Sequence, residues 1–431
     1  MATIEPLQVE PPAIRLSRGP RLTLFVLCMI YMCNAIDRNV LSVLFEPIKA
    51  EFALSDSRLG TLATGFGLSY AFSGLIFGIV ADRGSRRNVI AFCLTFWSVM
   101  TALCGMAQTF MHLFAARLGV GIGEAGASPA AMSIISDLYP AARRATAMSF
   151  YYLSTSVGFM IALALGGVVA SHFGWRATFL IAAVPGAFLV PVLLLAVREP
   201  RRGGADQSAA AAQERPSVRI FVLFAARQPA LLLLVLGSTI NVMALAGIGA
   251  WTVSYFVRVH AVSIATAGAY IGGLQGAMGI VGTLSGGLLA DLFGRRDVRA
   301  RLWLVAAATL VGLLCTFGWI VSPTFGLAAS FFGATAFVNS FWYGPVYSLA
   351  QGLVRVRMRA TMAATIYLIT NLGAGAGPAL IGYLSDHFNQ HHTGNGLALA
   401  LMSVASINLL AAGTFILAAR TLGRDLERAN G

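Results

Sequence analysis

The sequence predicts an all-α membrane protein with twelve transmembrane helices in two pseudo-symmetric six-helix halves. Three observations lead to this prediction: the composition, a series of apolar spans, and a motif that occurs once in each half of the chain. Of the 431 residues, 57% are hydrophobic and 11% are charged, whereas a soluble domain carries about 25% charged residues. The composition therefore indicates a polytopic membrane protein.

The apolar spans are each near or above the ~20 residues that a helix needs to cross a bilayer. We place them at residues 22–47, 57–81, 88–109, 110–137, 145–170, 176–197, 230–257, 265–290, 302–321, 324–353, 360–384 and 397–419. An even number of spans puts both termini on the same side of the membrane.

The net charge of +13 is distributed by side. Most of the arginines outside the spans lie on the side of the two termini, whereas the other side carries only Lys49, Arg58, Arg176 and Arg258. Basic residues accumulate in cytoplasmic loops, so we expect both termini in the cytoplasm. The basic charge is then topological, and no nucleic-acid partner is expected.

The five cysteines all lie inside spans, where small apolar packing is their ordinary role, so we expect neither a disulfide framework nor a zinc site. The first apolar run is too long for the core of a cleavable signal peptide. No glycosylation sequon occurs, the loops are short, and arginine largely replaces lysine. These features favour a bacterial inner membrane.

A loop motif repeats in the two halves. Gly78-x-x-x-Asp82-Arg83 at the end of the second span matches Gly287-x-x-x-Asp291 at the end of the eighth, and each is followed by paired arginines. Such a repeat is typical of transporters built from two related halves.

The domain boundaries that we predict are a cytoplasmic tail at 1–20, a first half at 21–198, a linker at 199–228, a second half at 229–420 and a cytoplasmic tail at 421–431.

Charged residues well inside the spans, away from their ends, occur only in the first half. They are Asp37 and Arg38 in the first span and Arg117 and Glu124 in the fourth. A charge at the bilayer centre costs roughly 2.5 to 3.5 kcal/mol, and such residues commonly mark proton relays or substrate paths. We expect Glu124 to carry the proton and Asp37 to be its partner, because an adjacent arginine favours the charged carboxylate whereas desolvation favours the neutral one. The alternative is a pair of structural salt bridges.

In the first span, Asn34 lies near the same helical stripe as Asp37 and Arg38. The fourth span carries glycines at short intervals. Small residues let the backbones of two membrane helices approach closely. The glycines concerned are Gly119, Gly121, Gly123 and Gly126.

The repeated loop and Arg117-x-x-x-Gly121-x-Gly123 resemble the signature motifs of the major facilitator superfamily. Four segments further resemble spinster-like transporters: Asp37-Arg38, GVGIGEAGASPAAMSIISDLYPAARRATA, His172-Phe173-Gly174-Trp175-Arg176 and Val197-Arg198-Glu199-Pro200. This resemblance implies the major facilitator fold, alternating access, and a lysophospholipid- or sphingoid-like substrate. An anion:cation symporter branch shares the aspartate–arginine pair and the Gly-Glu-Ala of the fourth span, which implies a small organic anion instead. The first loop departs from the general pattern, because Gly84 directly follows Arg83.

The spans of the second half carry no charge, and they offer amide and aromatic side chains instead. A central cavity would therefore have one charged wall and one apolar, aromatic wall, which suits an amphiphile. The substrate-binding residues that we predict are Asn34, Arg38, Arg117, Trp342, Tyr343, Tyr367 and Asn371.

The repeated loops are predicted gates. Each aspartate would lie near the N-terminus of a helix of the opposite half, where the helix dipole favours a carboxylate. The gating residues are Asp82, Arg83, Arg86, Arg87, Asp291, Arg295 and Arg296. The alternative is that these arginines only set topology. Pro129, Gly344-Pro345 and the glycine–proline run 373–378 are expected points of flexing.

We therefore expect a secondary active transporter, proton-coupled and monomeric, whose partners are a small-molecule or lipid substrate, protons and membrane lipids. A membrane sensor that binds its ligand without moving it is a rival, but the linker and tails are short for an output domain. An enzyme is not expected, because the chain has no nucleotide-binding loop and no HExxH motif. No cofactor and no metal are expected, and His387, His391 and His392 read as a solvated loop.

Overall fold

The computed structural model describes residues 18–201, 218–391 and 395–430. Most of the predicted N-terminal tail, the centre of the predicted linker and His392 lie outside these residues, and the side chain of Asp82 is not described either.

The described chain consists of helices. Their bounds are α1 Arg18–Phe52, α2 Asp56–Arg83, α3 Arg86–Gly105, α4 Phe110–Glu124, α5 Ala127–Leu138, α6 Ala141–Ala196, α7 Val218–Ala225, α8 Pro229–His260, α9 Ile264–Gly294, α10 Ala300–Val321, α11 Phe325–Val338, α12 Tyr343–Gly352, the short 3-10 helix η2 Val356–Met358, α13 Arg359–His391, α14 Gly396–Ser406 and α15 Asn408–Asn430.

Several helices begin at residues whose side chains cap the free amide groups of the first turn. Ser55, Ser85 and Thr109 accept hydrogen bonds from backbone amides three residues later, at the starts of α2, α3 and α4. Ser263 does the same for α9, and Pro229 occupies the first turn of α8, where its missing amide costs nothing.

Eleven helical segments of the described chain are long and apolar enough to cross a membrane, and one of them, Thr146–Ala196, has 51 residues. This segment holds two of the predicted spans, because Gly174 breaks the helix with a φ of 80° and a ψ of 168°. A left-handed φ is readily adopted by glycine, so the chain can turn back at this residue. The prediction of twelve transmembrane helices is confirmed.

Three predicted spans are interrupted: the span at 397–419 by the single residue Ile407 between α14 and α15, and two others beside a proline. α4 ends at Glu124 and α5 starts at Ala127, while α11 ends at Val338 and α12 starts at Tyr343. In both cases a proline follows the break: Pro129 and Pro345 have no amide hydrogen for the carbonyl four residues earlier, so the ladder is interrupted there. α13, by contrast, continues through Pro378.

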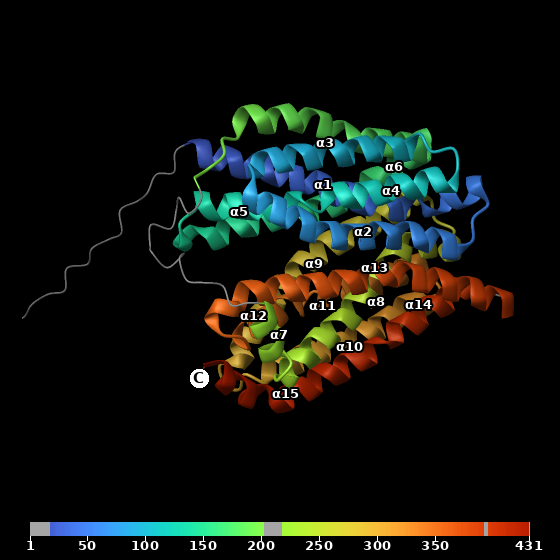
Figure 1. Cartoon of the computed structure of the whole chain (residues 1–431). Coiled ribbons are helices and arrows are strands. Elements are labelled where there is room, and N and C mark those ends of the chain that lie inside the picture. The colour runs from blue at the N-terminus through green and yellow to red at the C-terminus, as the bar shows by residue number, and fades with distance from the viewer. Residues whose placement is uncertain (1–17, 202–217, 392–394, 431) are drawn as a thin grey trace, which may run out of the picture.

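The two halves lie side by side along their length. In Figure 1, α1–α6 form one group and α8–α15 the other, with α2 and α9 facing the boundary. Across this boundary α2 packs against α13, and α6 packs against α9. We call the end of the bundle that carries Arg83–Arg87 and Arg295 the arginine-rich end, and the end that carries Asp56 and Arg258 the far end.

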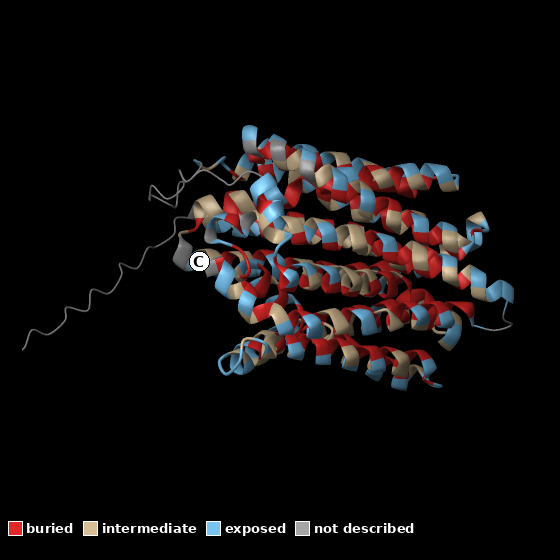
Figure 2. Cartoon of the chain, turned by 60° about the horizontal axis from the view of Figure 1, so that its bottom comes forward, coloured by how far each residue is buried: buried red, intermediate tan, exposed pale blue. Residues whose placement is uncertain are grey.

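Exposed side chains on the helices of the periphery are mostly large and apolar. Figure 2 shows exposed residues along the outer faces of the helices, and among them Leu195 and Leu288 have 86% and 72% of their surface exposed. Such a surface is unfavourable in water and suits contact with lipid.

The predicted glycine packing of the fourth span is confirmed. A Cβ atom on Gly123 would lie 2.8 Å from the backbone nitrogen of Trp97 in α3, and one on Gly126 would lie 2.6 Å from the Sγ of Cys93. α4 and α5 therefore approach α3 more closely than any larger residue would permit.

We predict that Gly123→Ala lowers the thermal stability of the detergent-solubilised protein, by an amount equivalent to about 1–3 kcal/mol, because the added methyl group overpacks the contact with α3. Gly413→Ala is the matched control, since a Cβ there meets nothing within 4 Å and alanine favours a helix. Unfolding followed by size-exclusion after heating measures both. Equal melting temperatures for the two variants would contradict the packing argument.

Candidate functional site

A cavity of about 350 Å³ lies between the two halves. The first half contributes α1, α2, α4 and α6 to its wall, and the second half contributes α8 to α13. The residues that line it include Arg38, Ser42, Phe45, Phe66, Tyr70, Arg117, Leu245, Ile248, Ile271, Gln275, Phe332, Asn339, Tyr343, Asn371 and Pro378.

The four charged residues predicted from the sequence come together beside this cavity. Asp37, Arg117 and Glu124 are 1%, 1% and 0% exposed, while the Arg38 side chain keeps 33% of its surface. Arg38 and Arg117 line the cavity, so the positive groups face it and the carboxylates lie behind them.

Within this cluster the two arginines have different partners. Arg38 makes the ion pair with Glu124, with 3.8 Å between its Nε and the Oε2 of Glu124. Arg117 donates instead to the backbone carbonyl of Asp37, at 3.1 Å. Arg117 and Glu124 are about two turns apart on α4, roughly 10 Å along the helix, so their charged groups meet different parts of α1.

Both oxygens of Glu124 and the Oδ1 of Asp37 are buried without a hydrogen bond from any residue that the structure describes. The Nε atoms of Arg38 and Arg117 are also buried and have no hydrogen-bond partner among the described residues. A structural salt bridge inside a protein is normally held by several hydrogen bonds, because an unpaired buried charge is costly. Among the described residues, these charges are therefore held by few hydrogen bonds of good geometry, with Asn34 close to Glu124 and with Thr101 and Trp97 close to Asp37.

Two aromatic rings of α2 support the arginines. The guanidinium carbon of Arg38 lies 4.5 Å from the ring centre of Tyr70 and 5.5 Å from that of Phe66, and that of Arg117 lies 4.7 Å from Phe66. These distances are within the range of cation–π attraction. The hydroxyl of Tyr70 also lies 3.2 Å from the hydroxyl of Tyr367 in α13, which joins the charged cluster to the second half.

The predicted binding residues of the second half occupy different positions. Tyr343 and Asn371 line the cavity, and Tyr367 pairs with Tyr70. Trp342 is 4% exposed and packs in the core of the second half, with its ring centre 4.2 Å from that of Tyr343. Asn34 is buried one turn before Arg38 in α1.

The second wall is more polar than predicted. Besides the apolar Leu245, Ile248, Ile271 and Phe332, it presents Gln275, Asn339 and Asn371 to the cavity. Gln275 lies on α9, Asn339 directly after α11 and Asn371 on α13, and only the folded structure brings the three amides to one wall.

At the arginine-rich end, Arg86 is the centre of a network within the first half. Its guanidinium pairs with Asp137 and Glu199 and donates to Ser133 and to the carbonyl of Pro200. Although partial burial opposes the effect, hydrogen bonds from the Arg87 amide and the Arg86 guanidinium lower the pKa of Glu199. The start of the predicted linker is thereby fixed to the start of α3.

The other predicted gating residues make fewer contacts. Arg83, Arg295 and Arg296 are exposed, and Asp291 lies 3.4 Å from Arg301 of the same half. Asp82 cannot be placed, since its side chain lies outside the described ones.

The contact expected at the loops, a carboxylate against a helix N-terminus of the opposite half, occurs at the far end. Asp386 of α13 accepts hydrogen bonds from the backbone amides of Asp56 and Ser57 in α2, at 3.0 and 2.8 Å, and from the Ser57 hydroxyl. The carboxylate thus occupies the positive end of the α2 dipole.

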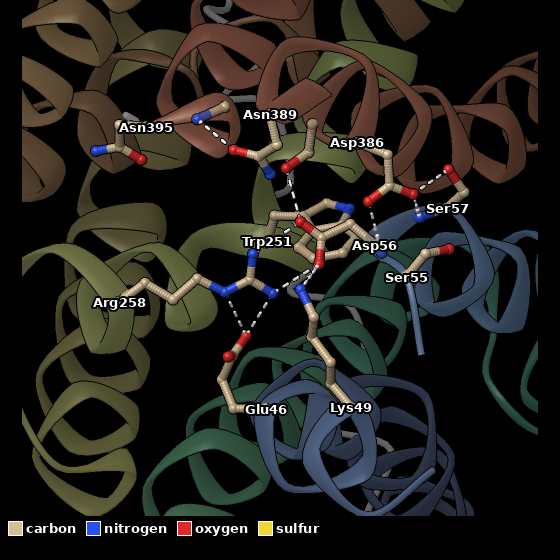
Figure 3. A network of polar contacts seen from close by, with 12 residues as sticks. Glu46, Lys49, Ser55, Asp56, Ser57, Trp251, Arg258, Asp386, Asn389 and Asn395 are labelled. Atoms are coloured by element: carbon tan, nitrogen blue, oxygen red, sulfur yellow. Dashed lines mark hydrogen bonds and ion pairs between the residues drawn. The ribbon is translucent and has the colours of Figure 1, made fainter. Parts of the chain in front are cut away.

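This contact is part of a larger set of residues, which we call the far-end network (Figure 3). Asp56 is fully buried at its centre and accepts a bidentate pair of hydrogen bonds from Arg258 of α8, at 2.7 and 2.8 Å. It is also bonded by Lys49 at 2.5 Å and by Ser385 at 2.6 Å, while Arg258 reaches Glu46 at 2.9 Å. The network consists of Glu46, Lys49, Asp56 and Ser57 from the first half and Arg258, Ser385 and Asp386 from the second.

Sequence reasoning missed this network. Lys49 and Arg258 were noted only as the few charges on the sparsely basic side. Lys49 bonds Asp56 of its own half, but the partners of Arg258, Asp56 and Glu46, lie 202 and 212 residues away in the other half. Neither helical periodicity nor a motif indicates such a pair.

The halves are closed against each other toward the far end. A Cβ on Gly60 would lie 2.5 Å from the carbonyl oxygen of Pro378, and one on Gly67 would lie 2.8 Å from the Cα of Gly375. Farther along α2, toward the arginine-rich end, a Cβ on Gly74 or Gly78 would meet no described atom within 4 Å. α2 and α13 therefore touch along the part of their length nearer the far end.

Comparisons with known proteins agree with this architecture. The family model described as "Major Facilitator Superfamily" matches residues 27–378. An "MFS-type efflux pump" of Mycolicibacterium smegmatis is 32% identical over 416 residues, which is 95% of each chain. "Protein spinster homolog 1" of Xenopus tropicalis is 27% identical, covering 94% of this chain and 81% of that protein.

Among solved structures, a bacterial homologue of the human lysosomal transporter spinster, in an inward-facing and unoccupied conformation, superposes with a TM-score of 0.87. It is 29% identical in sequence, and the match covers 95% of this chain and 98% of the other. The matched family model and the full-length similarity establish that this chain belongs to the major facilitator superfamily of transporters and resembles its spinster-like members.

Proposed function

We propose that this protein is a proton-coupled secondary transporter that moves an amphiphilic, lipid-like substrate by alternating access. The observation that carries the proposal is the position of Glu124, which is fully buried and 3.8 Å from an arginine that itself lines the cavity. A single guanidinium can serve either the carboxylate or an anionic group in the cavity.

The coupling step follows from this competition. When Glu124 is ionised, Arg38 neutralises it, and the cavity offers little free positive charge. When Glu124 takes a proton, the ion pair is lost and the Arg38 guanidinium becomes available to a phosphate or carboxylate, which arginine binds in a bidentate manner. Proton and anionic headgroup then occupy the site together. Asp37, buried beside Arg117, is the second titrating group in this proposal.

The lipid-like substrate is supported by the apolar part of the second wall and by the similarity to spinster homologues. The headgroup would lie at Arg38 and Arg117, and the apolar tail along Leu245, Ile248, Ile271 and Phe332. The lysophospholipid or sphingoid class fits this division.

A second candidate is a proton-coupled transporter of small organic anions, as in the anion:cation symporter branch. The amides of Gln275, Asn339 and Asn371 favour it, because a hydrocarbon tail gives no hydrogen bond to such groups.

We further propose that the arginine-rich end faces the cytoplasm of a bacterial cell, so that the far end faces outward across the inner membrane. In alternating access the two halves, 21–198 and 229–420, would rotate about the cavity as a monomer, joined by the linker 199–228. The far-end network would be the external gate, and the repeated loops with Asp82 and Asp291 would close the opposite side.

The first prediction from this proposed function concerns the external gate. Asp56→Asn should raise the rate at which a membrane-impermeant thiol reagent, added outside, labels a cysteine placed at Ser42 in the cavity wall. The amide cannot neutralise Arg258 and Lys49, and breaking a buried ion pair is costly, so the closed arrangement loses stability. Glu51→Gln is the matched control, because Glu51 pairs with Arg176 of the same half. Equal labelling rates in Asp56→Asn and Glu51→Gln would contradict the proposal that the far-end network is the external gate.

The second prediction concerns the proton carrier. Glu124→Gln should abolish substrate accumulation driven by a pH gradient in proteoliposomes, while substrate exchange without a gradient persists, because glutamine keeps the shape but cannot change charge. The gradient supplies about 1.4 kcal/mol per pH unit, so the loss is measurable. Glu51→Gln should accumulate substrate normally. If Glu124→Gln still accumulates substrate, the carrier is Asp37.

The third prediction concerns the substrate. Binding of lysophospholipids should tighten about fourfold for each added methylene, since each buried methylene contributes roughly 0.8 kcal/mol. Arg38→Ala should weaken the binding of lipids with a phosphate-bearing headgroup more than the binding of neutral lipids of equal chain length. Binding across acyl lengths decides the matter: a flat series together with tight binding of a small carboxylate would replace the lipid proposal with the organic-anion alternative.

A further inference from the structure

One buried side chain lies between the cavity and the far-end network. Trp251 of α8 is 0% exposed, and Figure 3 shows it next to Arg258 and Asp56. It does not line the cavity, but it contacts two residues that do, Phe45 and Pro378. The mechanism proposed above does not use it.

Toward the cavity, the indole is fixed at two points. Its Nε1 donates to the carbonyl of Pro378 in α13 at 2.9 Å, and its ring centre lies 4.9 Å from that of Phe45 in α1. Trp251 therefore touches a residue of each half that faces the cavity.

The Pro378 contact is at a weak point of α13. Proline removes one hydrogen bond of the helix and displaces its neighbours, and here the amide of the next residue, Ala379, donates to the Thr64 hydroxyl of α2 at 3.2 Å. The Pro378 region is thus held by Trp251 on one side and by the first half on the other. A change in the bend of α13 would alter both hydrogen bonds.

Toward the far end, Trp251 supports Arg258. The guanidinium carbon of Arg258 lies 5.6 Å from the indole ring centre, within cation–π range, and the two residues lie about two turns apart on α8. The same guanidinium makes the bidentate bond to Asp56 and the bond to Glu46 across the boundary. The ring beneath it therefore adds to the contacts that hold Arg258.

We propose that Trp251 is a positioning residue that couples the occupant of the cavity to the far-end network, an inference that rests on the proposed transport function. A ligand that moves Phe45 or changes the bend at Pro378 shifts the indole. The shift of the indole changes the support of Arg258, and with it the closure of the halves.

Two substitutions separate the contacts of Trp251. Trp251→Phe keeps a ring beneath Arg258 but removes the donor to Pro378, whereas Trp251→Leu removes both. Trp342→Phe is the matched control: Trp342 is also buried, does not line the cavity, and its Nε1 has no hydrogen-bond partner among the described residues. Each is made with Ser42→Cys in a chain whose five native cysteines are replaced.

The readout is external labelling of this cysteine in intact cells, with and without palmitoyl lysophosphatidylethanolamine. Without lipid, we expect labelling several-fold faster than in the parent for Trp251→Phe, faster again for Trp251→Leu, and unchanged for Trp342→Phe. The lipid should change the rate in the parent and in Trp342→Phe but not in Trp251→Phe. Parent-like labelling in Trp251→Phe, or an equal rise in Trp342→Phe, would overturn the proposal.

The two arms distinguish this inference from the function on which it rests. The lipid-free comparison tests the support of the network by Trp251 and needs no substrate. A parent that ignores the lipid counts against the proposed substrate class, while a Trp251→Phe variant that keeps a normal lipid response counts against the coupling.

Discussion

An ionised side chain within a bilayer must be surrounded by protein groups, and the arrangement of this molecule follows from that constraint. The charged residues well inside the spans, Asp37, Arg38, Arg117 and Glu124, all lie between helices beside the cavity, and none of these four is on the apolar periphery. Exposing such a charge to hydrocarbon is costly, so the charged side chains of α1 and α4 face each other and the outer surface that contacts lipid is apolar. The same constraint explains why Phe66 and Tyr70, which give π faces to two guanidinium groups, sit on the neighbouring α2.

The contacts between the halves combine close backbone approach with polar bonds. Helices in lipid gain little from burying apolar surface against one another, so close glycine contacts and polar bonds have to hold the boundary. α2 and α13 meet through Gly60 and Gly67 on one helix and Pro378 and Gly375 on the other, and the far-end network adds ion pairs. On α2 and α13 these contacts are concentrated toward the far end, so the boundary can open there while the two helices stay apart at the other end.

α1 joins the charged cluster to the far-end network. Asp37 and Arg38 lie at the cavity, and Glu46 and Lys49 lie in the network on the same helix, roughly 12 to 18 Å farther along. A movement of α1 that follows a change of charge at Glu124 would therefore reach Arg258 and Asp56 directly. In the proposal above, Trp251 is a second link to this network, from Phe45 at the cavity to Arg258.

The sequence by itself determined the helices, their number and the identity of the charged residues. These properties are local: an apolar run of about twenty residues, a glycine or proline at a break, and the cost of a charge in the membrane act on each segment separately. The sequence also separated the two halves, because the motif at Asp82 recurs at Asp291. Only the tertiary structure decided the pairs: Arg38 and not Arg117 meets Glu124, Trp342 lies in the core, three amides join the apolar wall, and Asp56 meets Arg258. The physical reason is that these contacts depend on how whole helices pack, and packing brings together side chains from distant parts of the chain whose separation in sequence carries no period.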